Sequence, residues 1–107
     1  RSSMTDFAEA LLAATEALER FEELGDRRGA AAALHVISTV HFAAAVPGRP
    51  GGHPSVEELE QALQASGEAR MLFCELGDAG GEALALSTAV HACLLQQQED
   101  KALRFAV

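Results

Sequence analysis

The six residues FEELGD at positions 21–26 return almost unchanged as FCELGD at positions 73–78 of this 107-residue chain. When residues 3–34 are laid over residues 55–86 without a gap, 15 of the 32 positions are identical. The shared positions include the Gly-Asp pair of the quoted stretch and a second glycine three residues further on. Chance similarity between alanine-rich helices would not align all of these signals, so the chain contains an internal repeat.

The apolar residues before each copy of the quoted stretch follow helical spacing. From residue 7 to 24, and again from 59 to 76, they recur at steps of three and four, which predicts two amphipathic helices. Gly25 and Gly77 can adopt the left-handed backbone conformation that ends a helix. The aspartate that follows each glycine can cap the helix that comes next.

Serines mark where the two amphipathic helices begin. Ser3 with Asp6 is a plausible capping pair, and Ser55 with Glu58 forms an S-x-x-E capping box.

Tyr and Trp are absent and β-branched residues are sparse, so the chain offers little from which strands are built. The sequence predicts a single all-α domain over 1–107, with helices at 3–24, 27–45, 55–76 and 79–97 and the start of a further helix at 99–107.

Between the two halves lies VPGRPGGHP at 46–54, which holds all three prolines and three of the nine glycines. A continuous helix is excluded there, because proline removes a backbone donor and clashes with the preceding turn. The composition fits a flexible tether and an ordered loop equally well.

Acidic residues outnumber basic ones 16 to 8, giving a formal net charge of −8. Such a field repels phosphate groups, so we expect no direct nucleic-acid partner and no binding to anionic membrane surfaces. Residues 29–48 include no Asp, Glu, Lys or Arg, but they are dominated by alanine and carry histidine, serine and threonine. We interpret them as a helix buried in protein and not as a membrane span.

The side chains that carry chemistry form no catalytic or metal-binding pattern. His35 and His41 are six residues apart and His91 and Cys93 two apart, so neither pair shares a helix face. The glutamates of the first helix lie on its polar face, where no apolar pocket would tune a catalytic carboxyl group. We therefore expect no metal, no cofactor and no enzymatic activity.

Cys74 and Cys93 have a spacing without a metal or redox signature. They are predicted to be buried, unreactive thiols, with Cys93 at a core position. Reduced cysteines indicate an intracellular, reducing compartment, either the cytoplasm or an organelle.

The phrases ALERFEELGDRRGAAAAL and ARMLFCELGDAGGEALAL resemble the tetratricopeptide family, in its long variant of about 40 residues per unit. The family's two small residues, seven apart on the second helix of each unit, match two pairs here: Ala10 and Ala17, then Ala62 and Ala69. Ala102 lies 40 residues after Ala62, so the C-terminal residues look like the opening of another second helix. The spacing of 52 then equals one unit plus a 12-residue insertion at the Pro/Gly stretch.

The resemblance implies antiparallel helical hairpins stacked as a short, right-handed α-solenoid fragment. Residues 27–45 and 79–97 would be the first helices of their units, which in this family line a concave groove. At one position of the first helices the family has a tyrosine-like residue. His41 and Cys93 stand at that position here, so the chain departs from the family pattern there. The groove-facing positions correspond to His35, Thr39, Phe42, Ser87, His91 and Leu94. That these six side chains only pack against an adjoining helix stays open.

The expected function is a non-enzymatic protein–protein interaction scaffold whose partner is an extended peptide or a helix. The groove lacks the basic and asparagine residues with which some family members clamp a carboxylate. The alternative is a small helical accessory subunit that stabilises a larger multiprotein complex, in an organelle or elsewhere. Two hairpins are fewer than the three or so units that a stable array needs, so a neighbouring subunit or further repeats of the same chain would complete the stack.

Overall fold

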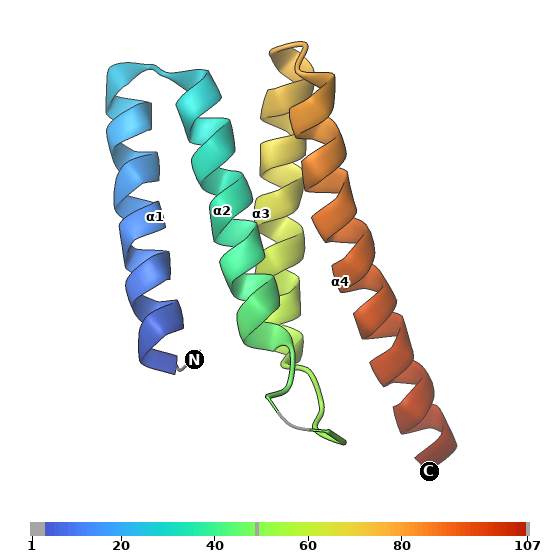
Figure 1. The fold of residues 1–107 in the computed structure, drawn as a ribbon. Coiled ribbons are helices and arrows are strands. Elements are labelled where there is room, and N and C mark those ends of the chain that lie inside the picture. The colour runs from blue at the N-terminus through green and yellow to red at the C-terminus, as the bar shows by residue number, and fades with distance from the viewer. Residues whose placement is uncertain (1–3, 49, 107) are drawn as a thin grey trace.

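The computed structural model describes residues 4–48 and 50–106, and this part of the chain contains four α-helices and no strand (Figure 1). The helices are α1 (Met4–Leu24), α2 (Arg27–Ala45), α3 (Val56–Glu75) and α4 (Ala79–Ala106). The all-α prediction is confirmed. Ser3, the cap expected for the first helix, lies outside the described residues.

The fourth helix is longer than the sequence predicted. A break between the helix at 79–97 and the further helix at 99–107 was expected, but α4 runs without interruption for 28 residues. The stretch from Gln96 to Lys101 contains neither glycine nor proline, and it is rich in residues with good helix propensity. Nothing in the local sequence therefore stops the helix at residue 98.

The turn between α1 and α2 has the predicted stop and cap. Gly25 adopts a φ of 69°, and the Asp26 N–H donates to the carbonyl oxygen of Phe21 at 2.9 Å, which closes the end of α1. Asp26 Oδ1 then accepts from the Gly29 N–H at 2.9 Å and caps α2. The turn between α3 and α4 repeats each of these bonds at the positions 52 residues later.

Each turn also brings a phenylalanine ring onto a glycine of the following helix. The ring of Phe21 lies against Gly29, and the ring of Phe73 lies against Gly81. A Cβ atom added at Gly81 would lie 2.6 Å from Phe73 Cγ, too close for any side chain. The second glycine of the repeat is therefore required by a close approach of ring and backbone.

The core consists largely of small side chains. One cluster joins Ala31 and Leu34 of α2 to Ala69 and Phe73 of α3 and to Ala85 of α4. A second cluster contains Ala45, Leu59 and Ala92 from the same three helices. The three alanines of the first cluster have no exposed surface, as expected where helix backbones approach closely. Alanines therefore form much of the seam between the two halves of the chain.

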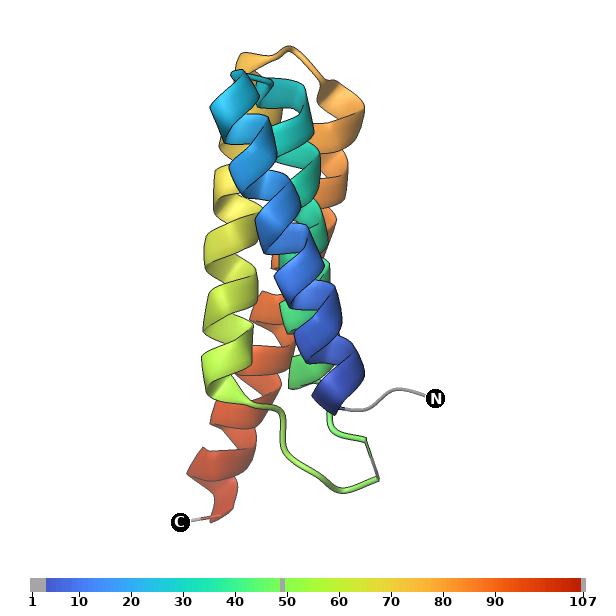
Figure 2. The ribbon, with the colours of Figure 1, turned by 90° about the vertical axis from the view of Figure 1, so that its left-hand side faces the viewer.

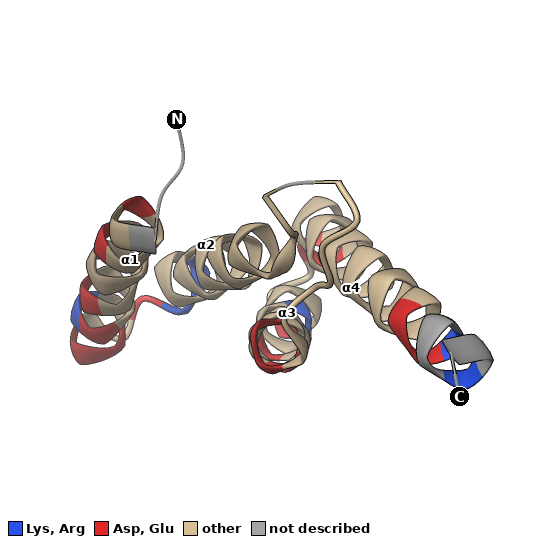
Figure 3. Cartoon of the chain, turned by 90° about the horizontal axis from the view of Figure 1, so that it is seen from below, with Lys and Arg blue, Asp and Glu red and all other residues tan. Residues whose placement is uncertain are grey.

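Neighbouring helices pack in chain order, from α1 to α2, α2 to α3 and α3 to α4, and the most extensive of these interfaces is that between α2 and α3. The backbone of α2 also comes close to α4, whereas the backbone of α1 comes close to α2 alone among the described helices. Seen along the helices, α3 lies on one side of α2 and α4 (Figure 3). α1 and α4 therefore form the two open ends of the array.

The expected capping box at the start of α3 is only half formed. Ser55 Oγ accepts from the Glu58 N–H at 3.3 Å. The Glu58 carboxylate does not return to the Ser55 N–H, which donates to the Ala45 carbonyl oxygen at 3.0 Å. Glu58 Oε1 instead lies 2.6 Å from Nδ1 of the largely buried His41. The carboxylate thus joins α3 to α2.

The segment 46–54 connects α2 to α3 at the end where α1 begins (Figure 2). His53 Nδ1 lies 3.0 Å from Glu99 Oε1, so the loop is also attached to the C-terminal half of α4. In Figure 3 the loop passes between α2 and α4 on the side opposite α3. No helix in the described part of the chain has both the length and the apolar character needed to cross a membrane.

Replacing Gly81 with alanine tests the close contact with Phe73. We expect Gly81→Ala to lower the free energy of unfolding by about 1–3 kcal/mol, because the buried ring has to move away from the new methyl group. Gly80→Ala is the matched control, since its Cβ would meet only Asp78 Oδ1 at an ordinary 3.6 Å. Urea denaturation measures both. Equal stability of the two variants would contradict the proposed role of Gly81.

The bond between His41 and Glu58 supplies a second test. Glu58→Ala leaves the largely buried His41 ring without its partner, and we expect the free energy of unfolding to fall by about 1–2 kcal/mol. The control is Glu57→Ala at the exposed neighbouring position, for which a change within about 0.5 kcal/mol is expected. A similar loss from both variants, measured by urea denaturation, would show that the bond contributes nothing.

Candidate partner-binding groove

The six residues predicted to line a groove belong to α2 and α4, one helix from each copy of the repeat. The structure brings one residue of each set into contact. The ring centroids of Phe42 on α2 and His91 on α4 lie 6.3 Å apart, with the ring planes tilted by 40°. This arrangement is an ordinary aromatic contact, and it joins the two halves of the surface.

On α2, His35 lies seven residues before Phe42 and so on the same helix face. It is half-buried, and its Nδ1 is a buried polar atom without a hydrogen-bond partner in the described part of the chain. Thr39 lies one turn further along and is exposed, with Oγ1 donating to the Val36 carbonyl oxygen at 2.7 Å. The α2 side therefore presents an aromatic ring and a hydroxyl group, while the unpaired nitrogen of His35 lies buried beneath the surface.

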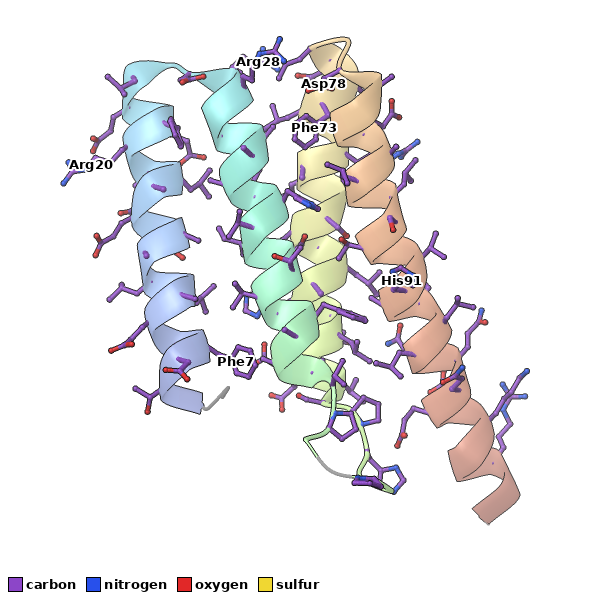
Figure 4. The ribbon with its side chains drawn as sticks, viewed as in Figure 1. Phe7, Arg20, Arg28, Phe73, Asp78 and His91 are labelled. Carbon is purple, nitrogen blue, oxygen red and sulfur yellow. The ribbon has the colours of Figure 1, made fainter. Side chains whose placement is uncertain are left out.

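On α4, the three predicted residues are all exposed. Ser87 and His91 are one turn apart, and Leu94, with half of its surface exposed, follows on the same side. His91 lies on the stretch of α4 that runs beside α2 (Figure 4). The surface thus combines the apolar groups of Phe42 and Leu94 with polar groups, and none of its six residues is a carboxylate, lysine or arginine.

The formal charges lie away from this surface. Acidic residues gather along α1 and on the side of α3 that faces away from the 46–54 loop (Figure 3). Arg27 pairs with Glu75, and Arg28 Nη1 lies 3.4 Å from Asp78 Oδ2, at the end of the molecule where α2 begins (Figure 4). A ligand of the groove would therefore be selected by shape, apolar contact and neutral hydrogen bonds.

A second surface feature, which the sequence interpretation did not identify, is an apolar depression between α1 and α2. It is lined by Ala10, Ala13, Ala14, Ala17, Phe21, Ala32, Ala33 and Val36. The lining leaves open space because alanine side chains are short. The sequence pattern that could have predicted this depression is the spacing of the alanines at 10, 13 and 17, together with the alanines at the start of the next helix.

The chemistry-bearing side chains remain dispersed. No three His, Cys, Asp or Glu residues of the described chain are grouped so that they could hold a metal ion. Cys74 and Cys93 are free thiols, and both are exposed, so the prediction that they are buried was wrong. The reason at Cys93 is that it lies on a face of α4 that no other described helix covers.

Comparisons with known proteins add no relative. The chain matches no protein-family model, no curated protein and no solved structure.

His35 provides a direct test of the groove's energetics. His35→Leu replaces a buried unpaired nitrogen with an apolar group of similar size, and we expect the free energy of unfolding to rise by about 1 kcal/mol. His53→Leu is the control, because His53 is exposed and its Nδ1 already has a partner in Glu99, so no gain in stability is expected. Thermal and urea denaturation measure both effects. A loss of stability in His35→Leu would show that the imidazole is satisfied where it lies.

Proposed function

We propose that this chain is a non-enzymatic scaffold for protein–protein interaction, built from tetratricopeptide-like helical hairpins. Its binding surface is the groove between α2 and α4, with His35, Thr39, Phe42, Ser87, His91 and Leu94 as contact residues. The observation that carries the proposal is the contact between Phe42 and His91. It joins equivalent helices of the two repeats into one continuous surface, as a stacked array requires.

The proposed ligand is an extended peptide or a partner helix of neutral or mixed polarity. An apolar anchor of the ligand would pack on Phe42 and Leu94, and its backbone or side-chain polar groups would bond to the exposed Thr39 and His91. Nothing in the proposed groove resembles a clamp for a terminal carboxylate. The favoured ligands are therefore internal segments of a partner protein and not its C-terminus.

The proposal assigns no catalytic residue and no cofactor. It places the chain in a reducing intracellular compartment, where the exposed thiols of Cys74 and Cys93 would remain reduced. The stacking of hairpins as a solenoid is supported by the contacts of α2 with both α3 and α4 and by the shared geometry of the two turns.

A selection experiment with synthetic peptides tests the groove. Peptides of extended and helical design are displayed as a library and selected on the wild-type chain. Their dissociation constants are then measured on Thr39→Glu and His91→Glu, which place a carboxylate on the α2 side and the α4 side of the groove. We expect each variant to weaken binding at least about tenfold, because the ligand would have to bury an unpaired charge.

Met71→Glu is the matched control, since Met71 is exposed on the outer side of α3 and the equivalent position of α1 is already Glu19. Binding by this variant should equal that of the wild type. Ligands that bind all three variants equally well would refute the groove, and a selection that yields no ligand would refute the scaffold function.

A further inference from the structure

We propose that copies of this chain associate head to tail, with α4 of one copy seated in the apolar depression between α1 and α2 of the next. The surfaces involved are the two open ends of the helical array, which lie at opposite sides of the molecule (Figure 1). The α4 surface adjoins the proposed groove at Leu94, but self-association is an activity that the proposed function does not include, so the inference goes beyond it.

The interface between the two halves of the chain supplies the template. In the second hairpin, Ala69 and Phe73 of α3 and Ala85 of α4 form a socket. Leu34 and Ala31 of α2 fill it, and all five side chains are buried. The hairpin formed by α3 and α4 is thus completed by a helix that precedes it in the chain.

The first hairpin contains the same socket, but no helix of the described chain fills it. Ala17, Phe21 and Ala33 stand 52 residues before the three socket residues of the second hairpin and are identical to them. All three line the depression between α1 and α2. The depression is therefore the equivalent of a socket that the molecule fills elsewhere.

The side chains that would fill the socket are present and exposed on α4. Leu86 and Ala83 stand 52 residues after Leu34 and Ala31 and are identical to them. Leu34 is 8% exposed, whereas Leu86 is 40% exposed. Val90, 52% exposed, takes the place of a fully buried serine. The face of α4 is at least as apolar as the α2 face that the molecule buries.

On the copy that provides the socket, the apolar surface continues along α1 beyond the socket residues. Ala62 and Ala65 of α3 are buried in the molecule, while the equivalent Ala10 and Ala13 of α1 are exposed. In α3, the small side chains at these positions permit close helix packing. The exposed alanines of α1 could permit the same packing against a helix of another copy. Seating α4 of one copy beside α1 of another would repeat the interface between α2 and α3, the most extensive interface of the chain.

The proposed contact is weaker than its template for two identifiable reasons. The pairs of Arg27 and Arg28 with acidic residues of the second hairpin have no counterpart, because α4 begins with Ala79 and Gly80. In addition, no loop links the partners, so association costs translational and rotational freedom. We therefore expect association in the micromolar to millimolar range of concentration.

The geometry determines the type of assembly. The socket and the face that fills it lie on different ends of the same chain, so the contact is heterologous and leaves one free socket and one free α4 face on every dimer. Growth then continues by addition of further copies. A distribution of oligomers is expected in place of a closed dimer.

Sedimentation velocity of wild-type chain and two variants tests this directly. Leu86→Glu disables the α4 face, and Ala13→Glu places a carboxylate in the depression that holds the socket; both replace side chains that are exposed in the single copy. We expect the weight-average mass of the wild type to rise with concentration, and each variant alone to remain a monomer. An equimolar mixture of the two variants retains one intact face and one intact socket, so it should form a dimer and nothing larger.

Two exposed apolar residues that belong neither to the lining of the depression nor to α4 serve as controls. Leu12→Gln and Met71→Glu should associate as the wild type does. Circular dichroism verifies that every variant is folded. A wild type that stays monomeric at millimolar concentration overturns the proposal, as does self-association of either single variant or a mixture that stays monomeric. The groove variants Thr39→Glu and His91→Glu should still associate, which separates failure of this proposal from failure of the binding groove.

The salt dependence of association gives a further expected result. Each copy carries a formal net charge of −8, so copies repel one another, and added salt screens this repulsion. Because the seam is apolar, raising the salt from low to physiological concentration should increase the weight-average mass of the wild type. A decrease with salt would indicate association through ion pairs and would contradict an apolar seam.

Discussion

The constraint on which the structure depends is the packing of a phenylalanine ring directly on a glycine at the start of the next helix. Since glycine has no Cβ, the ring of Phe21 lies against the backbone of α2, and the ring of Phe73 lies in the same way against α4. The Gly-Asp turn before each glycine ends one helix and caps the other within four residues. Ring, turn and cap together fix the approach of the helices in each hairpin, and this fixed approach allows alanines to serve as the core.

Building the same hairpin twice has a consequence for the surface. A residue that is buried in one copy of the repeat is exposed in the other wherever the array ends. Leu34 lies within the core and Leu86 lies on an open face, although both end the repeated stretch of sequence. The exposed apolar side chains of α4 are therefore the expected edge of a repeated packing unit, and they differ in origin from the scattered apolar residues that any surface carries.

Local signals in the sequence predicted those parts of the fold that local interactions determine. The left-handed glycines, the aspartate caps and the helical periodicity act over a few residues, and the structure has them where the repeat places them. The exposure of Cys93 and the partner of Glu58 depend on which helix lies alongside, and the chain's own periodicity does not contain that information. For the groove, helical spacing placed His35 and Phe42 on one face, but the contact with His91 requires the crossing of α2 and α4, which only the structure gives.

The two proposed surfaces adjoin one another along α4. Leu94 of the proposed groove follows Val90 of the association face by one helical turn, whereas His91 contacts Phe42 of α2. In a head-to-tail assembly, each added copy would place its α2 beside α4 of the preceding one, so the groove would continue across the junction. A partner with several binding segments would then engage neighbouring copies at a high effective concentration, and weak contacts at each groove would sum to firm binding. A short array would gain most from this, since each proposed groove alone offers only a few anchoring side chains.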